Sequence, residues 1–128
     1  MDNSATKRAT GYWIATALTA LLFVVPGAAL LLCVPHFTQD MAHLGYPAYF
    51  LAILGTWKIL GALVILAPGL ARLKEWAYAG MVFDATSAAL SRAAVGDGAV
   101  KIIAPLVITL LVLLSWKLRP AGRALIAA

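Results

Sequence analysis

Four long apolar stretches alternate with short polar segments along the chain. They run from about 11 to 34, 47 to 67, 75 to 95 and 98 to 116. Each is close to the length of about twenty residues that an α-helix needs to cross the hydrocarbon core of a bilayer. The connections are short, so consecutive helices are expected to be antiparallel neighbours. The pattern predicts an all-α, four-transmembrane-helix bundle with up-down topology, formed by residues 1–128 as a single domain.

Two of the predicted helices each carry one ionisable residue near the middle. Lys58 lies in the second helix and Asp84 in the third, and the turn between them is centred midway, near residue 71. In an antiparallel hairpin the two side chains therefore come to the same depth, near the bilayer midplane. A lone charge there costs at least about 2.5–3.5 kcal/mol, so we expect the two groups to pair or to line a wet cavity. An ion pair that only fixes helix register is the alternative.

The surroundings of this predicted pair indicate a site for a lipophilic molecule, with Asp84 and Lys58 as the candidate catalytic residues. Trp57 lies at the depth of Lys58, although tryptophan usually prefers the membrane interface, so it either lines a ligand cavity or packs against lipid. Small and polar residues share the helix face of Asp84, as a cavity wall or a packed interface requires. The candidate substrate-binding residues are Trp57, Ser87, Ser91, Arg92, Tyr46 and His43.

Composition and charge agree with a membrane protein. Hydrophobic residues make up 63% of the chain and charged residues 12%, about half of the ~25% that is usual in soluble domains. The net charge is +5, but the basic residues gather in the two terminal segments and the middle turn, which argues against nucleic-acid binding. By the positive-inside rule both termini are cytoplasmic, and we expect the bacterial inner (plasma) membrane. These basic residues are Lys7, Arg8, Arg72, Lys74, Lys117, Arg119 and Arg123.

The first outer loop offers a weaker candidate site. His36, Asp40 and His43 would share one face of a short helix, and such a set can bind zinc or iron. The loop supplies no fourth ligand, so we favour a solvated amphipathic segment and predict no metal. Cys33 is the only cysteine, which excludes an intrachain disulfide and dithiol redox chemistry.

Several short motifs carry a resemblance to a known family. They are HLGYP at 43–47, KILGAL at 58–63, PGLARLKEWAYAG at 68–80, the FD pair at 83–84 and VGD at 95–97. On these motifs the chain resembles the DoxX-like family over about 44 to 114. One position departs from the family pattern, because relatives usually carry a histidine after the serine of the third helix, where this chain has Arg92.

The resemblance implies a compact four-helix membrane bundle, and it leaves three functions open. The family takes its name from a subunit of a thiosulfate:quinone oxidoreductase, which favours a membrane oxidoreductase subunit or enzyme acting on a quinone-like substrate. Asp84 would then donate or accept a proton and Lys58 would tune it. Such a role needs a quinone or a redox partner protein, because we predict no cofactor held by the chain itself. The alternatives are a non-catalytic binding or assembly partner, homo-oligomers included, and a terpenoid or sterol isomerase or cyclase with Asp84 as general acid.

Overall fold

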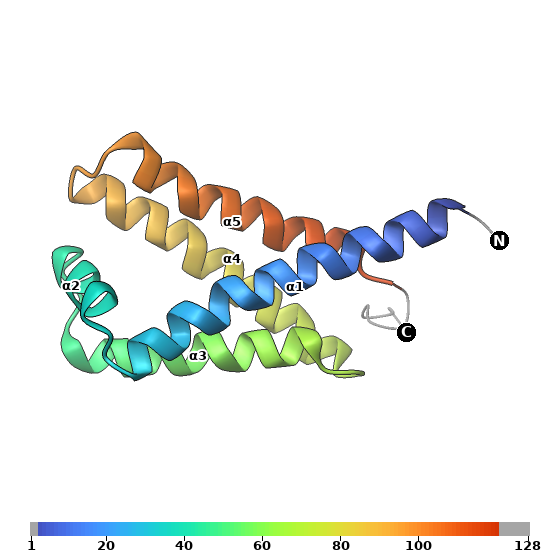
Figure 1. Ribbon diagram of the computed structural model, residues 1–128, viewed down its shortest axis with the longest axis horizontal. Coiled ribbons are helices and arrows are strands. Elements are labelled where there is room, and N and C mark those ends of the chain that lie inside the picture. The colour runs from blue at the N-terminus through green and yellow to red at the C-terminus, as the bar shows by residue number, and fades with distance from the viewer. Residues whose placement is uncertain (1–2, 121–128) are drawn as a thin grey trace.

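The computed structural model describes residues 3–120, and within them the chain forms five helices (Figure 1). They are α1 (Asn3–Leu31), α2 (Pro35–His43), α3 (Ala48–Leu66), α4 (Ala71–Ala94) and α5 (Ala99–Leu118). The predicted all-helical class is confirmed. The short helix α2 occupies the outer loop, and it starts with a proline whose fixed backbone angle suits the first turn of a helix.

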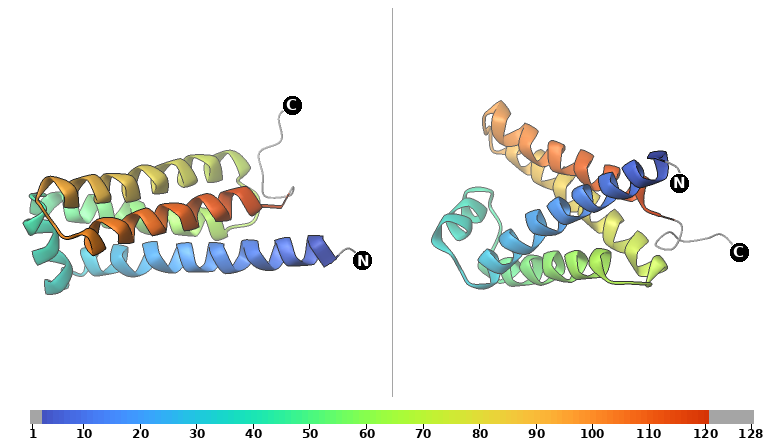
Figure 2. Two further views of the ribbon diagram at one scale, coloured as in Figure 1. Left: turned by 90° about the horizontal axis from the view of Figure 1, so that it is seen from above. Right: turned by 45° about the vertical axis from the view of Figure 1, so that its right-hand side comes forward.

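The four long helices run alternately in opposite directions, as the view from above shows (Figure 2). One end of the bundle, here called the inner end, holds the start of α1, the turn from α3 to α4 and the end of α5. The other end, the outer end, holds α2 and the turn from α4 to α5. At the inner end the Arg8 guanidinium donates a hydrogen bond of 3.0 Å to the carbonyl of Lys117, which ties the first long helix to the last.

The closest helix contact lies between α1 and α3, where two glycines face each other. A Cβ atom on Gly55 would come within 2.7 Å of the carbonyl oxygen of Gly27, and the converse distance is 3.0 Å. Only residues without a side chain permit such an approach, so this crossing is fixed by the sequence. α4 packs on α5 and on α3, and α5 also packs on α1. The buried apolar core of the bundle comprises Ala20, Phe23, Ala62, Ile65, Tyr78, Met81 and Val112.

Three of the described helices, α1, α3 and α5, are long and apolar enough to cross a bilayer. Their outward faces carry exposed leucine, isoleucine and valine side chains, which suit contact with lipid. α4 has 24 residues but is less apolar, because charged residues lie along it. Length and composition therefore identify three crossings rather than the four that we predicted.

The helix ends differ from the predicted bounds. α1 begins at Asn3 rather than near residue 11, because no proline or glycine interrupts the polar lead before Gly11. α4 begins at Ala71 rather than at Glu75. Gly69 and Leu70 both have positive φ angles, of 68° and 57°, so the chain reverses direction within very few residues and the helix can start earlier.

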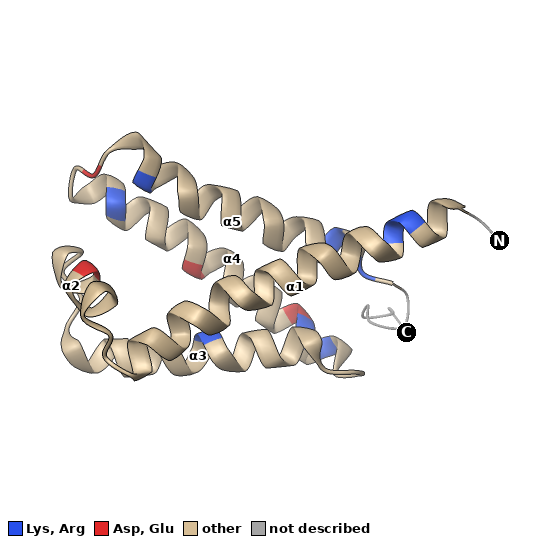
Figure 3. Cartoon of the chain, in the orientation of Figure 1, with Lys and Arg blue, Asp and Glu red and all other residues tan. Residues whose placement is uncertain are grey.

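Most basic residues lie at the inner end (Figure 3), and one of them is buried. Lys74, which the sequence placed among the basic residues of the middle turn, is only 1% exposed, and its ammonium donates hydrogen bonds to the carbonyls of Ala67 and Gly69. It thereby satisfies carbonyl groups that the end of α3 leaves open. Arg123 lies outside the described residues.

Candidate functional site

Lys58 and Asp84 meet in the interior of the bundle, near the middle of α3 and of α4. The Lys58 ammonium donates a hydrogen bond of 2.5 Å to Oδ2 of Asp84, so the predicted ion pair is present. The two side chains are 16% and 23% exposed, so both charges are largely withdrawn from the surroundings of the molecule. The equal distance of the two residues from the turn, read from the sequence, thus places them correctly relative to each other.

Only part of the hydrogen-bonding capacity of Lys58 and Asp84 is used within the protein. Phe23 of α1 lies beside it, with its ring centroid 4.9 Å from Nζ of Lys58, a cation–π contact that supports the ammonium without using one of its protons. Within residues 3–120, the only hydrogen bond of either side chain is the one that joins them. An ammonium has three protons to donate and a carboxylate has two accepting oxygens, so donor and acceptor capacity remains at the site.

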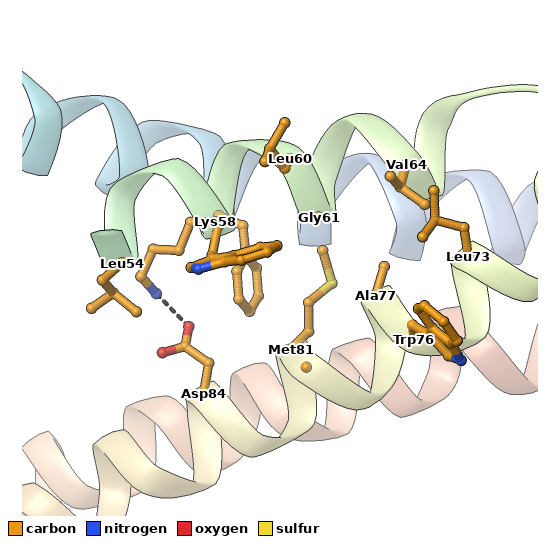
Figure 4. Close-up of a pocket in the computed structure, with 13 residues that line it drawn as sticks. Leu54, Lys58, Leu60, Gly61, Val64, Leu73, Trp76, Ala77, Met81 and Asp84 are labelled. Carbon is orange, nitrogen blue, oxygen red and sulfur yellow. Dashed lines mark hydrogen bonds and ion pairs between the residues drawn. The ribbon is translucent and has the colours of Figure 1, made fainter. Parts of the chain in front are cut away.

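A cavity of about 370 Å³ lies between α3 and α4 and reaches the ion pair (Figure 4). This size falls in the range of about 300–1,000 Å³ that small-molecule sites occupy. Gly80 leaves part of the space open, since a Cβ atom built there would meet nothing within 4 Å. The lining residues are Phe23, Leu54, Trp57, Lys58, Leu60, Gly61, Val64, Leu73, Trp76, Ala77, Gly80, Met81 and Asp84.

The cavity is elongated and polar at one end. Figure 4 shows Lys58 and Asp84 at one side of it, and Val64, Leu73 and Trp76 at the other. Along α3 the wall extends from Leu54 to Val64, and these ten residue steps span ~15 Å at the rise of an α-helix. Two tryptophans, Trp57 and Trp76, line the cavity while remaining 67% and 69% exposed. The space therefore opens sideways between two aromatic side chains and is not sealed inside the bundle.

Three of the eight predicted site residues, Lys58, Asp84 and Trp57, are brought together in this cavity. The other five lie outside its lining. Ser87 is exposed on α4, and its carbonyl accepts a hydrogen bond of 2.8 Å from the hydroxyl of Ser91. The Ser91 hydroxyl is also 2.5 Å from that of Tyr46, so this contact joins α4 to the segment before α3.

The remaining two, His43 and Arg92, belong to an ionic cluster at the outer end. Arg92 donates to the carboxylates of Asp40 at 2.7 Å and Asp97 at 3.2 Å, and His43 Nε2 lies 2.8 Å from Asp97. None of the residues of α2 is buried, so these polar contacts hold α2 against the end of α4. The Arg92 hydrogen bond lowers the pKa of Asp40 below its ordinary value of 3.8, and the hydrogen bond from His43 likewise lowers the pKa of Asp97.

This cluster accounts for two of the three side chains that we considered as metal ligands. Asp40 and His43 both have ionic partners, and in the part of the chain that the structure describes no group of three or more His, Cys, Asp or Glu residues is arranged to hold a metal ion. The cluster also shows what Arg92 does after the α4 serine. Its planar, permanently charged group bridges two carboxylates at once.

The sequence analysis missed Phe23, Met81 and Trp76 as cavity residues, because each reads as an ordinary core or interface side chain. For Trp76 a signal was available, because it precedes Asp84 by eight residues and Gly80 by four, on the same side of one helix. It also missed a buried set of hydroxyls where α1, α4 and α5 meet. There the Ser115 hydroxyl lies 2.5 Å from that of Thr16 and 2.8 Å from that of Tyr78.

Comparison with known proteins agrees with the motifs. The chain matches the DoxX-like family over residues 14–115, from the interior of α1 almost to the end of α5, and it belongs to that family. The matched range contains the ion pair, the cavity and the outer cluster. No curated protein and no solved structure matches the chain. The family and the three apolar helices together make this a small integral membrane protein.

Proposed function

We propose that the protein binds a lipophilic molecule drawn from the bilayer and acts on an oxygen atom of that molecule at the Lys58–Asp84 pair. The observation that supports this most is the cavity between α3 and α4, which connects a partly satisfied ion pair with the lipid-facing surface. A pair that served only to fix helix register would need no such space beside it. Intramembrane charges that line a cavity commonly mark a site of function.

The proposal includes a membrane placement. α4 would be the fourth crossing, since its charged and small residues can be covered by α3 and α5 instead of lipid. The pair would then lie near the midplane, with the basic inner end on the cytoplasmic side of the bacterial inner membrane.

The chemistry we favour is that of an oxidoreductase subunit with a quinone-like substrate. The Lys58 ammonium would donate a hydrogen bond to the substrate oxygen and stabilise negative charge that develops on it. Asp84 would pass a proton to or from that oxygen. Reduction of a quinone takes up two electrons and two protons, and the electrons would come from a partner protein that carries a redox group.

Two other functions remain to be compared with this one. A non-catalytic binding or assembly role is favoured by the short, direct contact between Lys58 and Asp84, which stabilises the resting protein without any substrate. A terpenoid or sterol isomerase or cyclase would need Asp84 as a general acid. The same carboxyl group would pass a proton to a quinone, so the identity of the bound molecule distinguishes this third role from the one that we favour.

Native mass spectrometry of the purified protein with its co-purified lipids tests the binding proposal. Gly80→Leu adds a side chain to the cavity wall without replacing either residue of the ion pair, while Ala93→Leu adds the same side chain to an exposed position of the same helix. We expect a bound small molecule on the wild type and on Ala93→Leu, and its loss from Gly80→Leu. Equal occupancy of all three proteins would show that the cavity is not the binding site.

A further inference from the structure

The two ends of the cavity differ in polarity, so they favour different parts of a bound molecule. Lys58 and Asp84 supply the only charged side chains in its described lining, and both stand at one end. From Asp84 to Trp76, eight residues apart on α4, the wall is formed by glycine, alanine, leucine, valine, methionine and aromatic residues over ~12 Å. Such a wall matches a molecule with one polar end and an apolar chain. A molecule with polar groups at both ends would leave one of them without a partner.

The unused donors of Lys58 and the unused acceptor of Asp84 indicate which polar group the ligand carries at its polar end. One ammonium proton and one carboxylate oxygen are used by the contact between Lys58 and Asp84, so further donors and an unused acceptor, Oδ1 of Asp84, remain there. A hydroxyl group both accepts and donates a hydrogen bond, so it can serve Lys58 and Asp84 together. A carbonyl or ether oxygen only accepts and would leave the second carboxylate oxygen unpaired.

We propose that the ligand is a lipid with a hydroxyl group at one end of an apolar chain. The hydroxyl oxygen accepts from Lys58 and its proton is donated to Asp84, while the chain lies along α3 and α4 toward Trp76. This inference rests on the proposed function and names the ligand class of the same site. A quinol and an isoprenoid alcohol share this hydroxyl chemistry.

The shape of the opening agrees with entry from the lipid. Trp57 adjoins Lys58, Trp76 lies at the far end, and both are exposed on the outside of the helix pair. A chain lipid can slide between them without leaving the hydrocarbon region. Gly61 lies in the wall opposite Met81, and a Cβ atom there would lie 3.4 Å from the Met81 side chain, an ordinary van der Waals contact.

The test compares probes that differ only in the polar end. Farnesol, its methyl ether and its aldehyde are bound to the purified full chain, and dissociation constants are measured by native mass spectrometry and calorimetry. We expect farnesol to bind about tenfold more tightly than the ether or the aldehyde, because only the alcohol serves both charged groups. A short-tailed quinol is compared under anaerobic conditions with its quinone, as a second pair of hydroxyl and carbonyl. Its affinity relative to farnesol shows whether the ring or the linear alcohol is preferred.

Two variants help to separate a failure of the hydroxyl preference from a failure of the proposed binding site. In the Lys58→Met/Asp84→Leu double variant the advantage of the alcohol should disappear, and in Gly80→Leu all probes should bind weakly. Equal binding of alcohol and ether to the wild type, or tighter binding of aldehyde and quinone, overturns the hydroxyl preference but leaves the proposed binding site intact. No binding of any probe overturns the proposed function as well. Since the comparison of probes uses the wild type, the test does not depend on a variant that folds.

Discussion

Removing one partner of the Lys58–Asp84 pair should destabilise the protein far more than removing both. The side chains are 16% and 23% exposed, so a charge left alone stays largely withdrawn from water. Breaking a buried pair in this way typically costs about 3–5 kcal/mol. The neighbouring cavity can admit water, which places Lys58→Met and Asp84→Leu near the lower end, at about 3 kcal/mol each.

The double variant Lys58→Met/Asp84→Leu replaces both charges by apolar side chains. It should lie within about 1 kcal/mol of the wild type, because apolar replacement of a buried ion pair is often neutral or stabilising. The two single losses are therefore not additive, and the coupling between them is about 5–7 kcal/mol. Lys101→Met, which removes an exposed charge at the outer end, is the control and should change stability by less than about 0.5 kcal/mol.

The assay is reversible unfolding in mixed micelles by titration with a denaturing detergent, followed by circular dichroism. The reasoning is refuted if the single variants each lose less than about 1 kcal/mol and their losses add up in the double variant. That result would mean that the two charges do not depend on each other, whatever their distance.

Further predictions concern other contacts and are checked by the same unfolding assay. Gly55→Ala should destabilise by about 1–3 kcal/mol, because its Cβ atom would come within 2.7 Å of a backbone oxygen of α1, whereas Gly80→Ala meets no atom within 4 Å and should be neutral or slightly stabilising. Equal effects of the two would contradict the close crossing. Arg92→Gln should cost about 1 kcal/mol at neutral pH, as a partly exposed network of ion pairs does. Arg92 lowers the pKa of Asp40, so the stabilisation by this ion pair is present above pH 3.8 and is lost as the pH falls through the lowered pKa of the folded state. A difference in stability between wild type and variant that persists at pH 2 would contradict this assignment. Lys74→Met should cost about 1–3 kcal/mol by removing the donor to two turn carbonyls, and an unchanged stability would refute its role there.

The sequence predicted the ion pair because its position depends on few variables. A short turn forces α3 and α4 to be antiparallel neighbours, and the equal spacing of Lys58 and Asp84 from that turn then sets their depth. The outer cluster involves more variables. Asp40 meets Arg92 only because α2 folds back onto the end of α4, and neither the length of α2 nor its orientation follows from periodicity in so short a segment.

Burial was the second point at which sequence reasoning fell short. The sequence placed Lys74 in the basic turn but did not show that its side chain is buried, because the carbonyl groups that it contacts are brought close only by the fold of that turn. For Trp76 the sequence indicated a position at the membrane interface, because aromatic residues near a helix start usually lie there. Its place in the cavity wall depends on the space left by Gly80. Both outcomes arise from packing in three dimensions, which a hydropathy pattern does not contain.

The most direct test of the account is native mass spectrometry of the folded Lys58→Met/Asp84→Leu double variant beside the wild type, both purified from the same membranes. The account predicts that the wild type retains a bound lipophilic molecule and that the double variant, although equally stable, does not. A double variant that carries the same molecule at the same occupancy would contradict the claim that this charge pair is the centre of a binding site.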